Sequence, residues 1–211
     1  MGIAAGTATA TTTVHEGGGS DGNAATTSEP TYDVAMRTRS AAWLAPLYPI
    51  ADTLTTQWSP AAGPVSGETH FREGRFQQDN VIVFADPITV ARRQFIDDRW
   101  QERSLSVASA GRLEDAIGAL WRLREASTPD DVSFPVFTGS KVLPLHAACQ
   151  VEAALRRCDV VVGAAPTDAS TDLHNTVTAW FSTDAARLPV RARLETRAGA
   201  VSVTLVDSPV R

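Results

Sequence analysis

Apolar and polar residues alternate along several stretches of the chain, which is the pattern of strands that bury one face. The clearest alternation runs through 190–195 and 201–205, and a turn at 197–199 joins the two stretches. The apolar face of this hairpin is continuous, and Arg191 and Arg193 point to the opposite, exposed face. The register pairs Leu194 with Val201, Ala192 with Val203 and Val190 with Leu205.

A second hairpin is predicted over 143–151 and 156–162. A turn centred on 153–154 brings the apolar residues of both strands to one face and sets Cys149 opposite Cys158. Because Ala-Ala is a poor pair for a tight turn, we expect a four-residue loop with the same centre. The two cysteines either form a disulfide in an oxidising compartment or stay as small buried thiols in the cytoplasm.

A third hairpin is predicted nearer to the N-terminus. Strands at 66–71 and 76–84 flank Gly74, whose freedom to adopt a positive φ suits a tight turn. The expected register puts Phe71 opposite Phe76 as an aromatic pair across the two strands.

A fourth hairpin joins strands at 88–96 and 99–107 through the Asp-Asp pair at 97–98. Its register sets Phe95 opposite Trp100. Adjacent acids can serve metal binding or acid–base chemistry, but aspartate is also a common turn residue, and we favour the turn.

One helix is predicted over 113–126, where Leu113, Ile117 and Leu120 belong to an apolar stripe with helical spacing. We expect these three side chains to be buried against the sheet. Trp121 lies beside the stripe, either as an anchor in the core or its rim or as a platform for a ligand. Charged residues at the two ends complement the helix dipole, and they are Glu114, Asp115, Arg122 and Arg124.

Together these elements predict a mainly β fold: a curved antiparallel sheet or a partly open barrel of hairpins, with one packed amphipathic helix. Residues 1–30 consist largely of Ala, Thr, Gly and Ser, with no aromatic residue and no periodicity. Such a segment buries too little apolar area to offset its ordering entropy, so we expect a low-complexity tail that only a partner would order. Residues 31–211 then form a single β-rich domain.

Composition narrows the classes of function. The 211-residue chain has a formal net charge of -5, which disfavours a non-specific nucleic-acid binder, and we expect no nucleic-acid partner. No apolar run approaches the roughly 20 residues of a membrane-spanning helix, so we expect no membrane span. The first arginine is Arg37, so a secretory leader with a cationic start is missing from this chain. Either the protein is cytoplasmic, or a native leader was removed.

A search for catalytic and metal-binding motifs assigns no residue to catalysis, to a cofactor or to a metal. The histidines lack metal-ligand spacing, and we expect His146 to be solvated on a polar strand face. Ser182 has no glycine-flanked nucleophile elbow around it, and no phosphate-binding loop or dinucleotide glycine pattern occurs. The four histidines are His15, His70, His146 and His174.

Four segments in a fixed order carry a family resemblance. They resemble the bacterial domain-of-unknown-function family numbered thirty-one hundred and eight, best over 112–207. The resemblance implies an exported, β-rich protein of the cell envelope, and the family offers no agreed catalytic residues to transfer. The segments are DAIGALWRLR at 115–124, FPVFTGSK at 134–141, WFSTDAARLPV at 180–190 and AGAV at 198–201.

These observations lead us to expect a non-enzymatic, periplasmic or envelope domain that binds an apolar ligand or a partner protein. The alternatives are a structural subunit of a larger assembly, with residues 1–30 ordered by its neighbours, and a hydrolase with an unrecognised site. A cytoplasmic location is the alternative to the envelope. The candidate residues are the disulfide pair Cys149 and Cys158, the anion- or partner-binding face of Arg191 and Arg193, and the ligand platforms Trp121 and Trp180.

Overall fold

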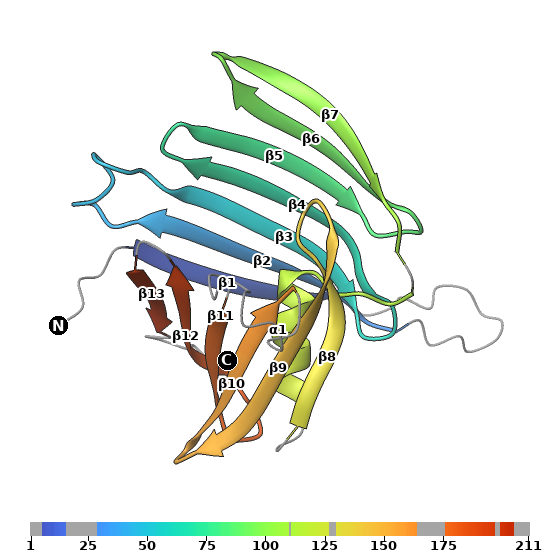
Figure 1. Cartoon of the computed structure of the whole chain (residues 1–211), viewed down its shortest axis with the longest axis vertical. Coiled ribbons are helices and arrows are strands. Elements are labelled where there is room, and N and C mark those ends of the chain that lie inside the picture. Colours follow the sequence, from blue (N-terminus) through green and yellow to red (C-terminus); the bar gives the residue numbers. More distant parts are fainter. Residues whose placement is uncertain are drawn as a thin grey trace. The chain divides into compact units, whose positions relative to one another are not determined.

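The computed structural model describes residues 6–15, 29–109, 111–126, 130–163, 176–196 and 199–204. The chain divides into two compact units, residues 1–113 and 114–211. Two antiparallel sheets and one helix make up the regular structure of the described residues (Figure 1). The prediction of a mainly antiparallel β fold with one packed helix is confirmed. The predicted division into a tail, residues 1–30, and one β-rich domain, residues 31–211, stays a prediction.

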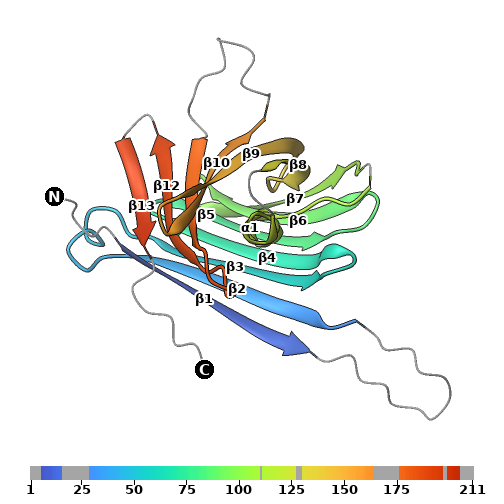
Figure 2. The same ribbon diagram turned by 90° about the horizontal axis from the view of Figure 1, so that it is seen from below.

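The first unit contains a seven-stranded sheet in which every strand pairs with its neighbours in sequence, in the order β1-β2-β3-β4-β5-β6-β7. Figure 2 shows these strands side by side, with β1 at one edge of the sheet. The strands are β1 (Gly6–His15), β2 (Thr31–Ser40), β3 (Ala51–Ser59), β4 (Gly63–Glu73), β5 (Phe76–Val83), β6 (Ile88–Ile96) and β7 (Arg99–Val107).

The predicted β6–β7 hairpin is confirmed in every pair. Phe95 lies opposite Trp100, and the centroids of the two rings are 5.6 Å apart. Asp97 and Asp98 have φ values of 51° and 58°. Positive φ at both central residues is the requirement of a type I′ turn, so the Asp-Asp pair serves as a turn.

The predicted register of the β4–β5 hairpin is wrong by two residues. Glu73 pairs with Phe76, and Phe71 lies opposite Gln78 instead of Phe76. Gly74, with φ of 58°, takes the first central position of a two-residue turn. A glycine is favoured there in a type II′ turn, and this moves the turn one position further along the chain than expected.

The edge strand β1 lies inside the segment that the sequence analysis treats as a tail. All ten residues from Gly6 to His15 pair with β2, and all ten are exposed. The strand is therefore held by backbone hydrogen bonds and by threonines, whose β-branched side chains suit extended backbone. Such a strand has no buried face, and so it has no hydrophobic alternation by which it could be recognised.

The second unit contains a six-stranded sheet in the order β13-β12-β11-β10-β9-β8. Here too each strand pairs with its neighbours in sequence. The elements are α1 (Ala116–Glu125), β8 (Asp130–Phe137), β9 (Val142–Glu152), β10 (Leu155–Val162), β11 (Thr176–Ser182), β12 (Pro189–Thr196) and β13 (Gly199–Thr204).

Helix α1 packs on this sheet and closes the core of the second unit. It begins at Ala116, because Asp115 acts as the N-cap: its Oδ1 accepts a hydrogen bond of 2.7 Å from the Gly118 backbone N–H. Leu123 is buried with 4% of its surface exposed, whereas Leu120 is only partly buried. The core consists of Ala119, Leu123, Phe134, Val136, Leu145, Ala147, Cys149, Cys158, Val160, Ala179 and Phe181.

The helix begins at Ala116, three residues later than the predicted start at 113. The carboxylate of Glu114 is fully buried before the helix begins, and it lies 3.5 Å from Nη1 of Arg122. The backbone of Glu114 pairs with β8, since its carbonyl accepts from the Phe137 N–H. Leu113 and Ile117 are buried as expected, but Leu120 is less buried than the stripe predicted.

The β9–β10 hairpin has the predicted register, with Cys149 opposite Cys158. The turn is shorter than the expected four-residue loop, because Glu152 already pairs with Leu155. Ala153 adopts a φ of 55° to make this two-residue turn. An alanine in this conformation carries a strain that glycine would not.

The C-terminal hairpin, β12–β13, is confirmed where it is described. Leu194 pairs with Val201 and Ala192 with Val203, whereas the expected partner of Val190, Leu205, lies outside the described residues. The predicted turn positions 197 and 198 also lie outside them.

The structure joins Cys149 and Cys158 in a disulfide within the core, with the two sulfurs 2.06 Å apart and the Cα atoms 4.1 Å apart. Only 5% of Cys149 and none of Cys158 is exposed. This places the disulfide between β9 and β10, in a core cluster that also contains Ala119 and Leu123 of α1.

We predict that the protein, unfolded without reductant, shows no free thiols and that two appear after reduction. Because the cysteines are 9 residues apart, chain entropy predicts that Cys149→Ala with Cys158→Ala lowers the free energy of unfolding by about 2.5–3 kcal/mol. Thiol titration and urea denaturation measure the two quantities. Two free thiols in unreduced protein would contradict the disulfide.

Candidate functional site

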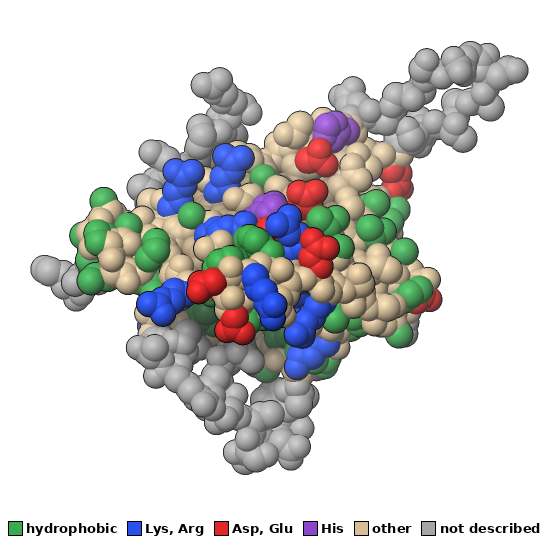
Figure 3. Space-filling view, turned by 90° about the horizontal axis from the view of Figure 1, so that it is seen from above, with side chains coloured by type: hydrophobic (Ala, Val, Ile, Leu, Met, Phe, Trp, Pro, Cys, Tyr) green, Lys and Arg blue, Asp and Glu red, His purple; other side chains and the backbone are tan. Residues whose placement is uncertain are grey.

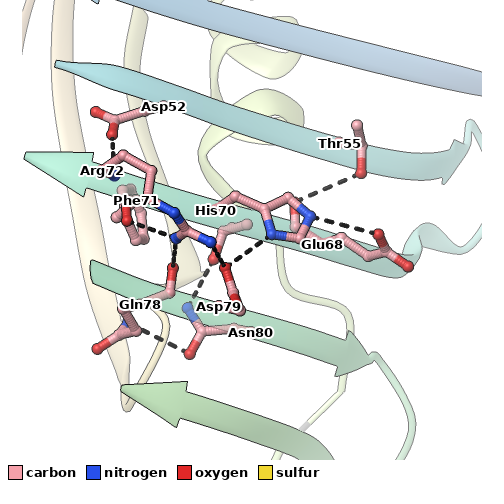
Figure 4. A network of polar contacts seen from close by, with 10 residues as sticks. Asp52, Thr55, Glu68, His70, Phe71, Arg72, Gln78, Asp79 and Asn80 are labelled. Atoms are coloured by element: carbon pink, nitrogen blue, oxygen red, sulfur yellow. Dashed lines mark hydrogen bonds and ion pairs between the residues drawn. The ribbon is translucent and has the colours of Figure 1, made fainter. Parts of the chain in front are cut away.

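A network of polar side chains joins β4 to β5 on one face of the first sheet (Figure 4). His70 and Arg72 are two residues apart on β4, so their side chains point to the same face of the sheet. Asp79 lies directly opposite His70 on β5. Asp79 Oδ1 is 2.9 Å from His70 Nδ1 and 2.7 Å from Arg72 Nη2. One carboxylate oxygen therefore contacts both the imidazole and the guanidinium.

The contacts of this network change the pKa of the Asp79 carboxyl. Burial alone would raise the pKa of this carboxyl, but the hydrogen bonds from His70 and Arg72 and their charges outweigh it, and the pKa is lowered. His70 Nε2 lies 3.8 Å from Oε2 of Glu68. Both nitrogens of the imidazole thus face carboxylates, an arrangement that binds strands together and does not pair the ring with a hydroxyl or thiol nucleophile.

Arg72 extends the network to the edge of the sheet. Its Nη1 donates to the backbone carbonyls of Phe71 and Gln78, at 2.8 Å and 3.3 Å. The guanidinium of Arg72 lies 5.5 Å from the ring centroid of Trp100, and that of Arg93 lies 5.0 Å from it. Two cation–π contacts therefore tie the side chains of β4 and β6 to β7.

The opposite face of the same strands carries a buried polar cluster. Asn80 is 3% exposed and Thr69 is 6% exposed. Asn80 Nδ2 donates to Thr69 Oγ1 at 2.6 Å, and Asn80 Oδ1 accepts from Arg92 Nε at 2.8 Å. Both the NH₂ group and the oxygen of the buried Asn80 amide therefore have hydrogen-bond partners, as buried polar groups usually do.

Two carboxyl groups meet where β3 begins and β4 ends. Asp52 Oδ1 accepts a hydrogen bond of 2.8 Å from the Arg72 backbone N–H. Burial raises the pKa of the Glu73 carboxyl, and the charge of Asp52 and a hydrogen bond to it raise it further. No group of three His, Cys, Asp or Glu side chains in the described residues is arranged to hold a metal ion.

Two of the candidate residues predicted from the sequence, Trp180 and Arg191, lie in contact in the structure. Trp180 on β11 pairs with Arg191 on β12, and the guanidinium lies 4.9 Å from the ring centroid. Arg193 is exposed, as is Arg191. Trp121 donates from Nε1 to Glu125 at 2.8 Å. A ligand-binding role for these residues stays a prediction.

The Ser182 and Asp184 pair is part of a turn. Ser182 Oγ donates to Asp184 Oδ1 at 2.8 Å, and this oxygen also accepts from the backbone N–H groups of Ala186 and Arg187. The hydrogen bond from Ser182, followed by that from Arg187, lowers the pKa of the Asp184 carboxyl. Capping of a turn accounts for these contacts.

Sequence reasoning missed the His70–Asp79 pair because it depends on register. The predicted β4–β5 turn would have set His70 opposite Gln77, two positions before Asp79. The signal was present in Gly74, whose preference for the first central position of a two-residue turn gives the observed register. His174 lies outside the described residues.

We predict that Asp79→Asn lowers the melting temperature at neutral pH and that this difference shrinks in acid. A carboxyl whose folded-state pKa lies below the ordinary 3.8 stabilises the fold above that value, and the stabilisation is lost as the pH falls through the lowered pKa. Thermal melts of both proteins from pH 7 downward measure the difference. Asp98→Asn, in an exposed turn, controls for the lost charge. A difference that persists unchanged to the most acidic pH would contradict the prediction.

Comparison with known families identifies one match, which spans nearly the whole chain. The model of the family described as "Protein of unknown function (DUF3108)" matches residues 2–206. Comparisons with curated proteins and with solved structures give no match. In the part of the chain that the structure describes, no helix is long and apolar enough to cross a membrane. The family match confirms the resemblance carried by the sequence, and the chain belongs to the DUF3108 family.

Proposed function

We propose that this chain is a non-enzymatic domain of the cell envelope that binds a partner protein by adding a strand to the open edge at β1. The observation that carries the proposal is the edge itself. β1 is the terminal strand of the seven-stranded sheet, and its ten residues are exposed. An edge strand presents unpaired backbone N–H and C=O groups, which another extended chain can pair with.

The composition of β1 favours strand addition. From Gly6 to Val14 the strand has no charged residue and no proline, and its pairing with β2 has no bulge. Charges, prolines and bulges are the usual devices that prevent an edge from pairing. A ten-residue edge without them is open to a partner strand.

The other edges of the two sheets lack this combination of length and composition. β7 carries Arg99, Glu102 and Arg103, and β8 carries Pro135 in the middle of the strand. β13 is uncharged but has only six residues. The longest edge without a protecting residue is therefore β1.

The location in the envelope is supported by the disulfide between Cys149 and Cys158. Structural disulfides persist in oxidising compartments and are rare in the reducing cytoplasm. Membership in a family associated with exported proteins agrees with this location. The carboxylate contacts of His70 favour a structural role for the network, which is why we place binding ahead of hydrolysis.

Site-specific photo-crosslinking in the source cells tests the proposal. A photoreactive amino acid at Thr9 in β1 should give one discrete cross-linked product, because its side chain flanks the added strand. The same amino acid at Ser104, exposed on β7, is the matched control and should give none. Thr11→Lys should reduce the product formed at Thr9, because a lysine on an edge strand opposes pairing.

The mass of the product identifies the kind of partner. Twice the 22.4 kDa of the chain would indicate a second copy, as in a structural assembly, and any other mass a different protein. The absence of a discrete product from Thr9, or the same product from Thr9 and Ser104, would overturn the proposal.

A further inference from the structure

The connection between β2 and β3, which we call the 41–49 loop, presents large hydrophobic side chains to solvent. Leu47 is 79% exposed, Trp43 is 54% exposed and Tyr48 is 47% exposed. Phe76, at the start of β5, is 40% exposed. Single exposed hydrophobic residues are ordinary on protein surfaces, but a group on one short loop marks an interaction site.

Hydrogen bonds give the 41–49 loop a defined shape. At its base, the Ser40 N–H donates to the Ile50 carbonyl at 3.1 Å, and the Ile50 N–H donates to Ser40 Oγ at 3.0 Å. Within it, the N–H groups of Ala45 and Tyr48 donate to the carbonyls of Ala41 and Leu44, at 2.9 Å and 2.8 Å. The loop is thus folded on itself by its own backbone hydrogen bonds.

The loop also rests on the turn between β4 and β5. The Gly74 N–H donates to the Pro49 carbonyl at 2.8 Å. The Tyr48 ring lies so close to Gly74 that a Cβ at position 74 would be 3.1 Å from its Cε2. Glycine at this position therefore lets the ring pack on the turn, next to which Phe76 begins β5.

Three arginines lie close in sequence to this loop and to the β4–β5 turn on which it rests. Arg39 and Arg37 precede the loop on β2, and Arg75 follows Gly74 in the β4–β5 turn; all three are exposed. In Figure 3 a group of hydrophobic side chains projects on the left of the molecule, with Lys or Arg side chains above and below it. The carboxyls of Asp52 and Glu73 also lie at the base of the loop, but both side chains are half-buried, whereas the three arginines are exposed. The exposed charge next to the loop is therefore mainly positive.

We infer that the 41–49 loop docks the protein on an anionic phospholipid surface, with Trp43, Leu47 and Tyr48 in the interface and the arginines on the lipid phosphates. Aromatic side chains with a polar edge favour the membrane–water boundary, and basic residues beside them favour anionic lipids. A projecting loop also needs no complementary pocket in a bilayer, because lipid chains deform around it. The site borders β1, because Arg39 and Arg37 pair with Thr7 and Thr9, but the inference does not depend on the proposed function.

Co-sedimentation with lipid vesicles tests this inference. The wild-type chain should bind vesicles of phosphatidylcholine that contain phosphatidylglycerol, more weakly at high salt, and should bind pure phosphatidylcholine less. Leu47→Ser should weaken binding roughly tenfold, because burial of the leucine side chain is lost. Arg39→Gln and Arg75→Gln should each weaken it about fivefold, and only on the anionic vesicles.

The control is a hydrophobic pair of similar exposure elsewhere on the same sheet. Val81 and Val83 on β5 are 50% and 48% exposed, and Val81→Ser with Val83→Ser should leave vesicle binding unchanged. Trp43→Ser gives a second test of the loop, and circular dichroism melts show whether each variant is folded. No binding of the wild type to anionic vesicles would overturn the inference. So would equal loss in the valine control, or binding that Leu47→Ser and Trp43→Ser both leave intact.

Discussion

The pairing of each strand with its neighbour in sequence is the constraint on which the rest of the structure depends. In both sheets the spatial order of the strands is their order along the chain. Each pair is therefore positioned by its own connection, and among the connections that the structure describes, those at 74–75, 97–98 and 153–154 are turns of two residues. A turn this short leaves no freedom in register, so the residues at the turn decide which side chains meet far along the strands.

The particular contacts of the molecule follow from these registers. The turn at Gly74 sets His70 opposite Asp79, and the carboxylate then receives Arg72 as well. The turn at Ala153 sets Cys149 opposite Cys158. Since a shift of one residue would move these side chains to the other face, the polar network and the disulfide would not form in any adjacent register.

The sequence predicted two hairpin registers well. For β6–β7, the Asp-Asp turn and the strand pattern indicated the same pairing. For β9–β10, the apolar alternation of the two strands gave the register although Ala-Ala is a poor turn pair. For β4–β5 the hydrophobic alternation did not determine the register, because a shift of two residues leaves every side chain on the same face of the sheet. Only the turn distinguishes such registers, and the expected one placed Gly74 away from the first central position.

Two features were beyond the reach of hydrophobic patterning, for opposite reasons. β1 buries no side chain, so its threonines and alanines resemble a low-complexity tail although its backbone is paired. The 41–49 loop contains tryptophan and leucine, which usually indicate a core, yet Trp43 and Leu47 are exposed on a loop whose backbone is folded by hydrogen bonds. Burial is inferred from side chains, whereas these two segments are positioned by backbone groups.

The proposed binding of a partner requires that β1 is an ordered strand whose outer edge is open. Amide hydrogen exchange of the dilute, monomeric protein, followed residue by residue, measures this directly. In an antiparallel pair, alternate residues direct their N–H groups to the neighbouring strand and away from it. We predict alternating protection along Gly6–His15, with every second amide exchanging slowly and those between them exchanging fast. Uniformly slow exchange would contradict an open edge, and uniformly fast exchange would contradict the strand.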